Sequence, residues 1–105
     1  MSYQQQETDG RIIQFIKLKS SLSEEEVYQK AKEREPEFRA IPGLLQKYYV
    51  KLNEPDQFGG IYIWDSRESL AAFRASDLAA SIPQAYELKE APNIELMDLL
   101  FQLRE

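Results

Sequence analysis

Residues 58–73, FGGIYIWDSRESLAAF, decide the fold, because one short run contains a strand, a turn and the start of a helix. The β-branched and aromatic residues 61–64 suit a central strand that is buried on both faces. Asp65 is a good N-cap residue, and Glu68 three positions later resembles a capping box, so a helix is predicted directly after the strand. Apolar residues recur at helical spacing as far as residue 82, and Pro83 is expected to end this helix.

A strand, a helix and a second strand are predicted before this run. Residues 11–19 form the first strand, with apolar side chains on both faces, and residues 44–52 form the second. Between them, Ser23 and Glu26 make an S-x-x-E capping box that starts a helix, and Pro36 predicts a kink or a break in it. One face of this helix carries Val27, Ala31, Arg34 and Phe38.

The rest of the chain completes an α+β pattern. Residues 84–92 are predicted to be irregular or a short helix, and residues 94–103 to be the last strand. The order β-α-β-β-α-β is the ferredoxin-like arrangement, a four-stranded antiparallel sheet with helices on one face. We therefore expect residues 11–105 to form a single domain, preceded by a flexible polar N-terminal segment, residues 1–10.

Composition limits the classes of function. The chain has 105 residues, a net charge of −5, and neither histidine nor cysteine. The negative charge argues against a nucleic-acid partner. The missing histidine and cysteine remove the commonest general base and the commonest metal ligands, so we expect no metal site. No apolar run approaches the roughly 18 residues of a membrane span, and no secretory signal is visible, so a cytoplasmic protein is expected.

The sheet face away from the helices is predicted to be apolar. It would carry Ile13 and Phe15, or the side chains opposite to them, together with part of residues 96–103. Such an apolar surface on one chain is typical of an association site. We therefore expect a homodimer formed through the open sheet face.

Residues 42–73 also resemble a known family. The matching motifs are Pro42-Gly43-Leu44, then Gly59-Gly60-Ile61-Tyr62, then Trp64 followed by Asp65-Ser66. They resemble the dimeric α+β barrel superfamily, in particular the antibiotic-biosynthesis monooxygenase group and its YdhR-like branch. The resemblance implies an aromatic-lined pocket between sheet and helices, and oxidation of phenols or anthrones by O₂ without a cofactor.

The resemblance also implies particular residues. In the oxygenases of this group a Trp at the place of Trp64 lies near the substrate, and an Asn precedes it by four positions. This chain has Gly60 at that earlier position. Haem-degrading relatives need a histidine in the following helical region, and this chain has none.

The candidate site residues come from three strands. Trp64 and Tyr62 share a strand face and would form a flat wall and a hydroxyl for a planar ligand, or they are simply core aromatics. Gln14, on an otherwise apolar face, is either hydrogen-bonded to the backbone or directed at a ligand. Tyr49 is the better polar candidate of its strand, because Tyr48 lies on a face that looks like core.

Three functional hypotheses remain open from the sequence. The first is a cofactor-independent monooxygenase of a small aromatic molecule, with Trp64 and Tyr62 as catalytic and Gln14 and Tyr49 as ligand-binding residues. Deprotonation of the substrate would then fall to Tyr49, a lysine or bulk base. The second is a non-catalytic homodimer that binds a small aromatic or lipid-like ligand. The third is a dimer whose pocket is only packing.

Overall fold

The computed structural model describes residues 9–104 and confirms the ferredoxin-like α+β fold, with a four-stranded antiparallel sheet in this part of the chain. The predicted flexible segment, residues 1–10, lies outside the described residues except for its last two positions. The elements are β1 (Ile12–Lys19), α1 (Glu24–Arg39), β2 (Leu44–Lys51), β3 (Gln57–Trp64), α2 (Arg67–Arg74), α3 (Asp77–Ala80), α4 (Ile82–Ala85) and β4 (Asn93–Asp98).

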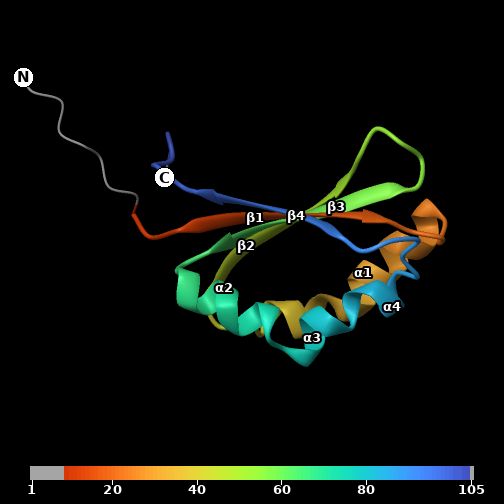
Figure 1. Cartoon of the computed structure of the whole chain (residues 1–105), viewed down its shortest axis with the longest axis horizontal. Helices are drawn as coiled ribbons and strands as arrows, with labels where there is room; N and C mark the ends of the chain where they lie inside the picture. Colours follow the sequence, from red (N-terminus) through yellow and green to blue (C-terminus); the bar gives the residue numbers. More distant parts are fainter. Residues whose placement is uncertain (1–8, 105) are drawn as a thin grey trace, which may run out of the picture.

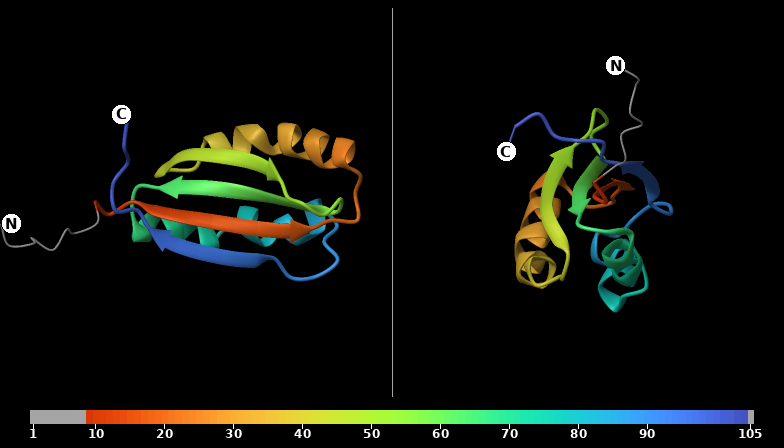
Figure 2. Two further views of the ribbon diagram at one scale, coloured as in Figure 1. Left: turned by 90° about the horizontal axis from the view of Figure 1, so that it is seen from above. Right: turned by 90° about the vertical axis from the view of Figure 1, so that its left-hand side faces the viewer.

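The described chain forms two layers, a sheet with the strand order β2-β3-β1-β4 and a layer of helices on one of its faces (Figure 1). α1 runs beneath the β2 side of the sheet, and the short helices α2, α3 and α4 follow one another on the other side (Figure 2). The opposite face of the sheet carries no helix in this part of the chain (Figure 2). Within residues 9–104, no helix is long and apolar enough to cross a bilayer.

The strand register decides which side chains reach the core. In β1 the buried residues are Ile12, Gln14 and Ile16, and they pair with Trp64, Tyr62 and Gly60 of β3. Directly paired residues of antiparallel strands share a face, so this set points toward the helices. The buried apolar core consists of Ile12, Ile16, Val27, Phe38, Phe58, Tyr62, Trp64, Leu70, Phe73, Ile82 and Tyr86.

A bulge in β2 reverses the face on which Tyr48 was expected. The regular pairing with β3 shifts between Leu44 and Gln46, so the alternation of side chains restarts there. Tyr48 pairs with Ile61 on the open face and is 54% exposed, so its predicted place with the core is wrong. Lys47 and Tyr49 consequently lie on the helix-facing side, paired with Tyr62 and Gly60.

The capping box at Ser23 is confirmed, since the Ser23 hydroxyl accepts a hydrogen bond from the Glu26 amide and the Glu26 carboxylate accepts one from the Ser23 amide. The predicted alternative of a break at Pro36 is wrong, because α1 continues to Arg39. The final turn is stabilised by burial of Phe38 and by an ion pair from Arg39 to Glu35 at 3.4 Å.

The second helical region differs from the single helix expected up to Pro83. Ser66, not Asp65, is the N-cap of α2, and the Asp65 carboxylate instead accepts hydrogen bonds from the hydroxyls of Ser66 and Ser69. Ser76 caps the separate helix α3, and its hydroxyl also donates a hydrogen bond of 2.6 Å to the Phe73 carbonyl in the last turn of α2. Pro83 lies in the first turn of α4, where a missing amide hydrogen removes no helical hydrogen bond.

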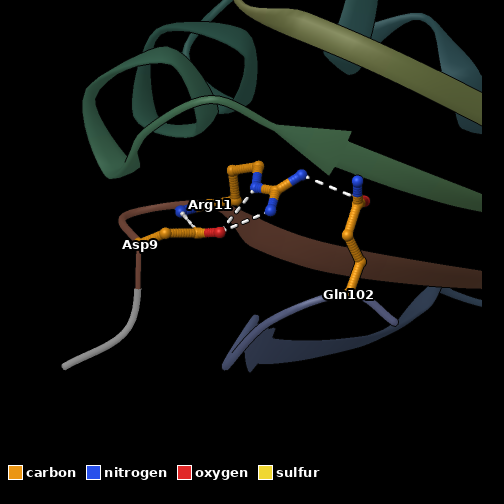
Figure 3. A network of polar contacts seen from close by, with 3 residues as sticks. All are labelled: Asp9, Arg11 and Gln102. Atoms are coloured by element: carbon orange, nitrogen blue, oxygen red, sulfur yellow. Dashed lines mark hydrogen bonds and ion pairs between the residues drawn. The ribbon is translucent and has the colours of Figure 1, made fainter. Parts of the chain in front are cut away.

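The last strand ends at Asp98 rather than near residue 103. Asp98 pairs with Ile12, the first residue of β1, so the chain beyond Asp98 has no strand residue left to pair with. Arg11 holds this tail by another route, because its guanidinium donates to the Gln102 side chain at 3.1 Å and also contacts the Asp9 carboxylate (Figure 3).

Candidate functional site

The most unusual polar group in the described structure is the amine of Lys47. Its Nζ atom lies over the aromatic faces of Phe38, Tyr49 and Tyr62, at 3.5, 4.3 and 4.5 Å from the ring centroids. The rings come from α1, β2 and β3, so the packing of the helix on the sheet assembles this enclosure. We call Lys47 with these three rings the lysine cage.

Burial and a second cation change the charge state of this amine. Burial, and after it the positive charge of Arg34, lower the pKa of Lys47 from 10.5 to about 7. The electron-rich ring faces act in the opposite direction, because they favour the ammonium form. The amine therefore exchanges protons close to neutral pH, where ordinary lysines stay charged.

Arg34 is the second cation of the site and extends from α1. Its guanidinium lies 5.7 Å from the ring centroid of Phe38 and 5.9 Å from that of Tyr86. One terminal nitrogen donates a hydrogen bond of 2.8 Å to the Ser81 hydroxyl. Its Nε atom is buried and has no hydrogen-bond partner among the described residues.

The tyrosines of the site remain protonated. Burial raises the pKa of Tyr62, Tyr49 and Tyr86, so none of these hydroxyls forms an anion near neutral pH. They can donate or accept hydrogen bonds. As a general base at neutral pH, Lys47 is better suited than Tyr49.

A cavity of about 180 Å³ opens beside the cage, between α1 and the strands β2 and β3. An apolar cavity of about 150 Å³ is known to bind benzene, so this volume is enough for one aromatic ring. The lining is mostly apolar and aromatic: Leu18, Glu24, Val27, Tyr28, Ala31, Lys47, Tyr49, Val50, Lys51, Phe58, Gly59, Gly60 and Tyr86. At its rim, Lys51 is neutralised by an ion pair to Glu24 at 2.7 Å.

Gly60 makes the cage possible. A Cβ atom at this position would lie 2.9 Å from Cε1 of Tyr62 and 3.2 Å from Cε of Lys47. The ring and the lysine stem thus occupy the space that a side chain of residue 60 would need. Lys47 extends from β2 to within 3.2 Å of the place that a Cβ atom of residue 60 would take, the position at which the resemblance implies an Asn.

Trp64 and Gln14 form a buried pair behind the cage. The indole Nε1 donates to Gln14 Oε1 at 2.9 Å, and Trp64 has no exposed surface. The Gln14 amide thus bonds to a side chain. From the sequence, it was expected to bond either to the backbone or to a ligand. The Trp64 indole stacks on Tyr62 with ring centroids 6.0 Å apart and planes 5° from parallel.

The structure therefore brings the predicted residues together as a chain of contacts. Gln14 contacts Trp64, Trp64 contacts Tyr62, and the rings of Tyr62 and Tyr49 both contact Lys47. Of the four predicted residues, only Tyr49 lines the cavity beside the cage. Gln14 instead lines a second hollow of about 260 Å³ between β1, β4 and the helices α2 to α4.

Lys47 and Arg34 were not singled out from the sequence. Arg34 gave a usable signal, since it is a charged residue within an otherwise apolar helix face. Lys47 gave none, because the β2 bulge sets its orientation and the rings around it come from distant segments. Among residues 9–104, no group of three or more His, Cys, Asp or Glu side chains is arranged to hold a metal ion.

Solved structures share this fold. A protein of unknown function from Nitrosomonas europaea superposes with a TM-score of 0.75 at 20% identity, covering 94% of this chain and 98% of its own. SnoaB, a cofactor-independent oxygenase from Streptomyces nogalater, gives 0.73 at 12% identity, covering 91% and 99%. A Caulobacter crescentus protein, assigned provisionally to the antibiotic biosynthesis monooxygenases, gives 0.66 at 19% identity, covering 90% and 93%.

The chain thus has the fold of the antibiotic-biosynthesis-monooxygenase-like α+β proteins. No protein-family model matches the sequence, and no curated protein matches it.

Proposed function

We propose that this protein is a cofactor-independent monooxygenase of a small, electron-rich aromatic substrate of the quinol or anthrone type. The observation that carries the proposal is the lysine cage at the wall of a ring-sized cavity. The shared fold with SnoaB, itself a cofactor-independent oxygenase, supports the same class of reaction.

In this proposal the substrate supplies the electrons. In an anthrone, one oxygen atom of O₂ replaces the two hydrogens of the activated CH₂ carbon as a carbonyl, and the other leaves as water. In a hydroquinone, one oxygen atom adds to a ring carbon as a hydroxyl, and the two phenolic hydrogens leave with the other as water, which gives a hydroxyquinone. The protein binds the ring, excludes water and orients the reacting carbon. The mostly apolar lining of the cavity suits these tasks.

The predicted site residues have different roles in this proposal. Tyr49 contacts the ring of the substrate, because it lines the cavity. Tyr62 lies directly behind Gly60 and holds one face of the lysine cage. Trp64 and Gln14 keep the Tyr62 ring in place through the stack and the 2.9 Å hydrogen bond.

Oxygen uptake tests the proposal. Wild-type protein is mixed with a panel of hydroquinones and anthrones, beside the variants Tyr49→Phe and Trp64→Phe. We expect uptake with the wild type and a reduced rate with each variant. Tyr48→Phe is the matched control, because Tyr48 neighbours Tyr49 but lies on the open face. Absence of turnover with every substrate would count against an oxygenase, and full activity of Trp64→Phe would count against a role of Trp64 in the reaction.

A second candidate is a non-catalytic protein that binds a small aromatic or lipid-like ligand. Trp64 favours this alternative, since the indole has no exposed surface and its N–H is already bonded to Gln14. Ligand binding that changes the Trp64 fluorescence, with no product and no oxygen uptake, would distinguish it from the enzyme.

We also propose that two copies of the chain pair through the open sheet face. Phe15, Ile61 and Tyr48 are paired across β1, β3 and β2 on that face, and form an apolar row. Met97 of β4 pairs with Ile13 on the same face and is 44% exposed. Apolar rows of this kind are typical of a surface that is covered by a partner.

A further inference from the structure

Lys47 and Arg34 form a pair of enclosed cations without a counter-ion. Both contact the ring of Phe38, Lys47 through Nζ at 3.5 Å and Arg34 through its guanidinium carbon at 5.7 Å. In the described part of the chain neither takes part in an ion pair, whereas Lys51 on the same face of β2 is bound to Glu24. The Nε atom of Arg34 is also buried without a partner.

None of the described carboxylates lies within ion-pair distance of Lys47 or Arg34. Glu35 is the acidic residue of α1 that acts on Tyr49, and it already contacts Lys32 at 3.7 Å and Arg39 at 3.4 Å. The other titratable groups that line the cage or its cavity are Tyr49, Tyr62, Tyr86, Tyr28 and Glu24, and Glu24 is paired with Lys51. Arg34 also borders a surface hollow lined by Glu25, Glu26, Glu33 and Glu87. Since Tyr49, Tyr62 and Tyr86 stay neutral and Glu24 is paired with Lys51, Lys47 and Arg34 have no anion in direct contact among the described residues.

Unpaired enclosed cations are costly, and an anionic ligand would offset that cost. The cavity on which Lys47 opens is otherwise mostly apolar, with the Lys51–Glu24 ion pair at its rim, and has room for a single ring. A ligand that satisfies both requirements is an aromatic ring bearing one acidic oxygen. A neutral phenol can enter such a cavity more readily than a charged one and become an anion after it is bound.

We infer that the site takes an acidic phenol and binds it as the phenolate, with Lys47 as the group that accepts the phenolic proton. The O–H bond of the phenol breaks, the proton adds to the neutral amine of Lys47, and the resulting ammonium pairs with the phenolate oxygen. No electron is transferred in this step. Arg34 is a positioning residue, since its charge keeps the amine neutral in the empty site and favours the anion in the filled one.

This inference deepens the proposed function, because a phenolate is the electron-rich form that O₂ would oxidise. It can nevertheless be tested separately from the oxygenase proposal, since proton transfer can be observed without turnover. It also limits the substrate class: one ring lies in the cavity, and further rings of an anthrone-like molecule would extend beyond its mouth.

The test uses 4-nitrophenol, whose phenolate has its own visible absorption band. The dye is titrated with pH in the presence and absence of the full-length protein. We expect binding to wild type to lower the pKa of the dye by about one to three pH units, the effect of a nearby opposite charge. 4-Nitroanisole, which has no acidic proton, serves as the matched ligand.

Variants identify the group that accepts the phenolic proton. Lys47→Met should abolish the change in the dye's pKa and weaken 4-nitrophenol binding on the order of tenfold to a hundredfold, the effect of losing a bond to a charged group. Binding of 4-nitroanisole should be unchanged. Lys89→Met, at an ion-paired lysine that does not line this cavity, should behave as wild type. Arg34→Met should move the onset of dye ionisation to higher pH, since the phenolate would lose one of the two positive charges that stabilise it.

The outcomes separate this inference from the oxygenase proposal. Dye ionisation by wild type but not by Lys47→Met, with no oxygen uptake on any substrate, supports the inference and refutes the oxygenase. Oxygen uptake that persists in Lys47→Met, together with unchanged dye ionisation, overturns the inference and leaves the oxygenase standing. A wild-type protein that does not alter the dye's pKa also overturns the inference. Thermal melts of each variant confirm that it is folded.

Discussion

Gly60 shows how one absent side chain can shape a site. Lys47 and Tyr62 occupy the space that a residue-60 side chain would need. A larger residue would therefore have to displace either the lysine stem or the ring edge, and the lysine stem, as the more flexible of the two, would move first.

Gly60→Ala is predicted to disturb the lysine cage. The added methyl group would sit 2.9 Å from the Tyr62 ring and 3.2 Å from the Lys47 stem, and overpacking of this kind costs about 1–3 kcal/mol. Urea denaturation should show this loss, and 4-nitrophenol titration should show a weakened effect on the dye. Full stability together with unchanged dye binding would contradict the described packing at this position.

Lys47 should make the free energy of unfolding increase as the pH rises above neutrality. Because the pKa of Lys47 is about 7 in the folded protein and near 10.5 in the unfolded chain, the unfolded chain binds more protons between these values. Stability should therefore rise with pH above about 7. The rise should stop as unfolded tyrosines begin to ionise near pH 10, since the folded tyrosines resist ionisation.

The measurement is the free energy of unfolding at several pH values, for wild type, Lys47→Met and Lys51→Met. Lys47→Met should lose the rise and should be relatively more stable at acidic pH, where wild type must bury an ammonium. Lys51→Met should retain the rise. Equal pH profiles for wild type and Lys47→Met would mean that the amine is not buried as described.

At the scale of the elements, α1 is the helix that brings Phe38 and Arg34 to the site. Its start is fixed by the reciprocal bonds of Ser23 and Glu26, and its last turn ends beyond Pro36. Fraying of the first turn would loosen the Val27 side of the cavity, whereas Phe38 lies close to the other end.

Ser23→Ala is predicted to destabilise the protein by about 1 kcal/mol, the usual effect of losing an N-cap oxygen. Denaturant unfolding provides the measurement. Ser21→Ala is the control, because the hydrogen bond described for Ser21 uses its backbone amide and survives the change. An equal effect of the two substitutions would argue against the cap.

Local chemistry explains which elements were predictable. The Ser23 capping box and the strand patterns act over a few neighbouring residues, so they could be read directly from the sequence. The β2 bulge, the continuation through Pro36 and the separate helices α2, α3 and α4 depend on packing between distant segments. Sequence periodicity contains no information about such contacts, and the position of Tyr48 was mispredicted for this reason.

The site was predictable to a similar extent. The pattern of β3 placed Trp64 and Tyr62 on one face, and their stacking follows from that. Gln14 was recognised as a polar group in an apolar strand, but its partner lies 50 residues away in the chain. Lys47 could not be recognised, since its surroundings come from α1, β2 and β3 together.

At the scale of the whole molecule, we expect two copies of the chain to pair through the open sheet face. Replacing Ile61 by Glu would place a charge in the middle of the row formed with Phe15 and Tyr48. We expect a dimer for wild type and a monomer for Ile61→Glu in analytical ultracentrifugation, with an unchanged circular dichroism spectrum. Tyr28→Glu, an exposed position on α1, is the control and should remain dimeric. A monomeric wild type would refute pairing through this face.

The unusual acidity of the Lys47 ammonium has a consequence for covalent chemistry. An uncharged primary amine is a nucleophile, whereas ordinary surface lysines remain protonated near neutrality. The chain has no cysteine or histidine to compete for an electrophile. A limiting amount of an acylating reagent that is small enough to enter the cavity should therefore modify Lys47 ahead of the other lysines. Peptide mapping of the acylated protein, with and without a bound aromatic compound, would then report directly on whether the cavity is occupied.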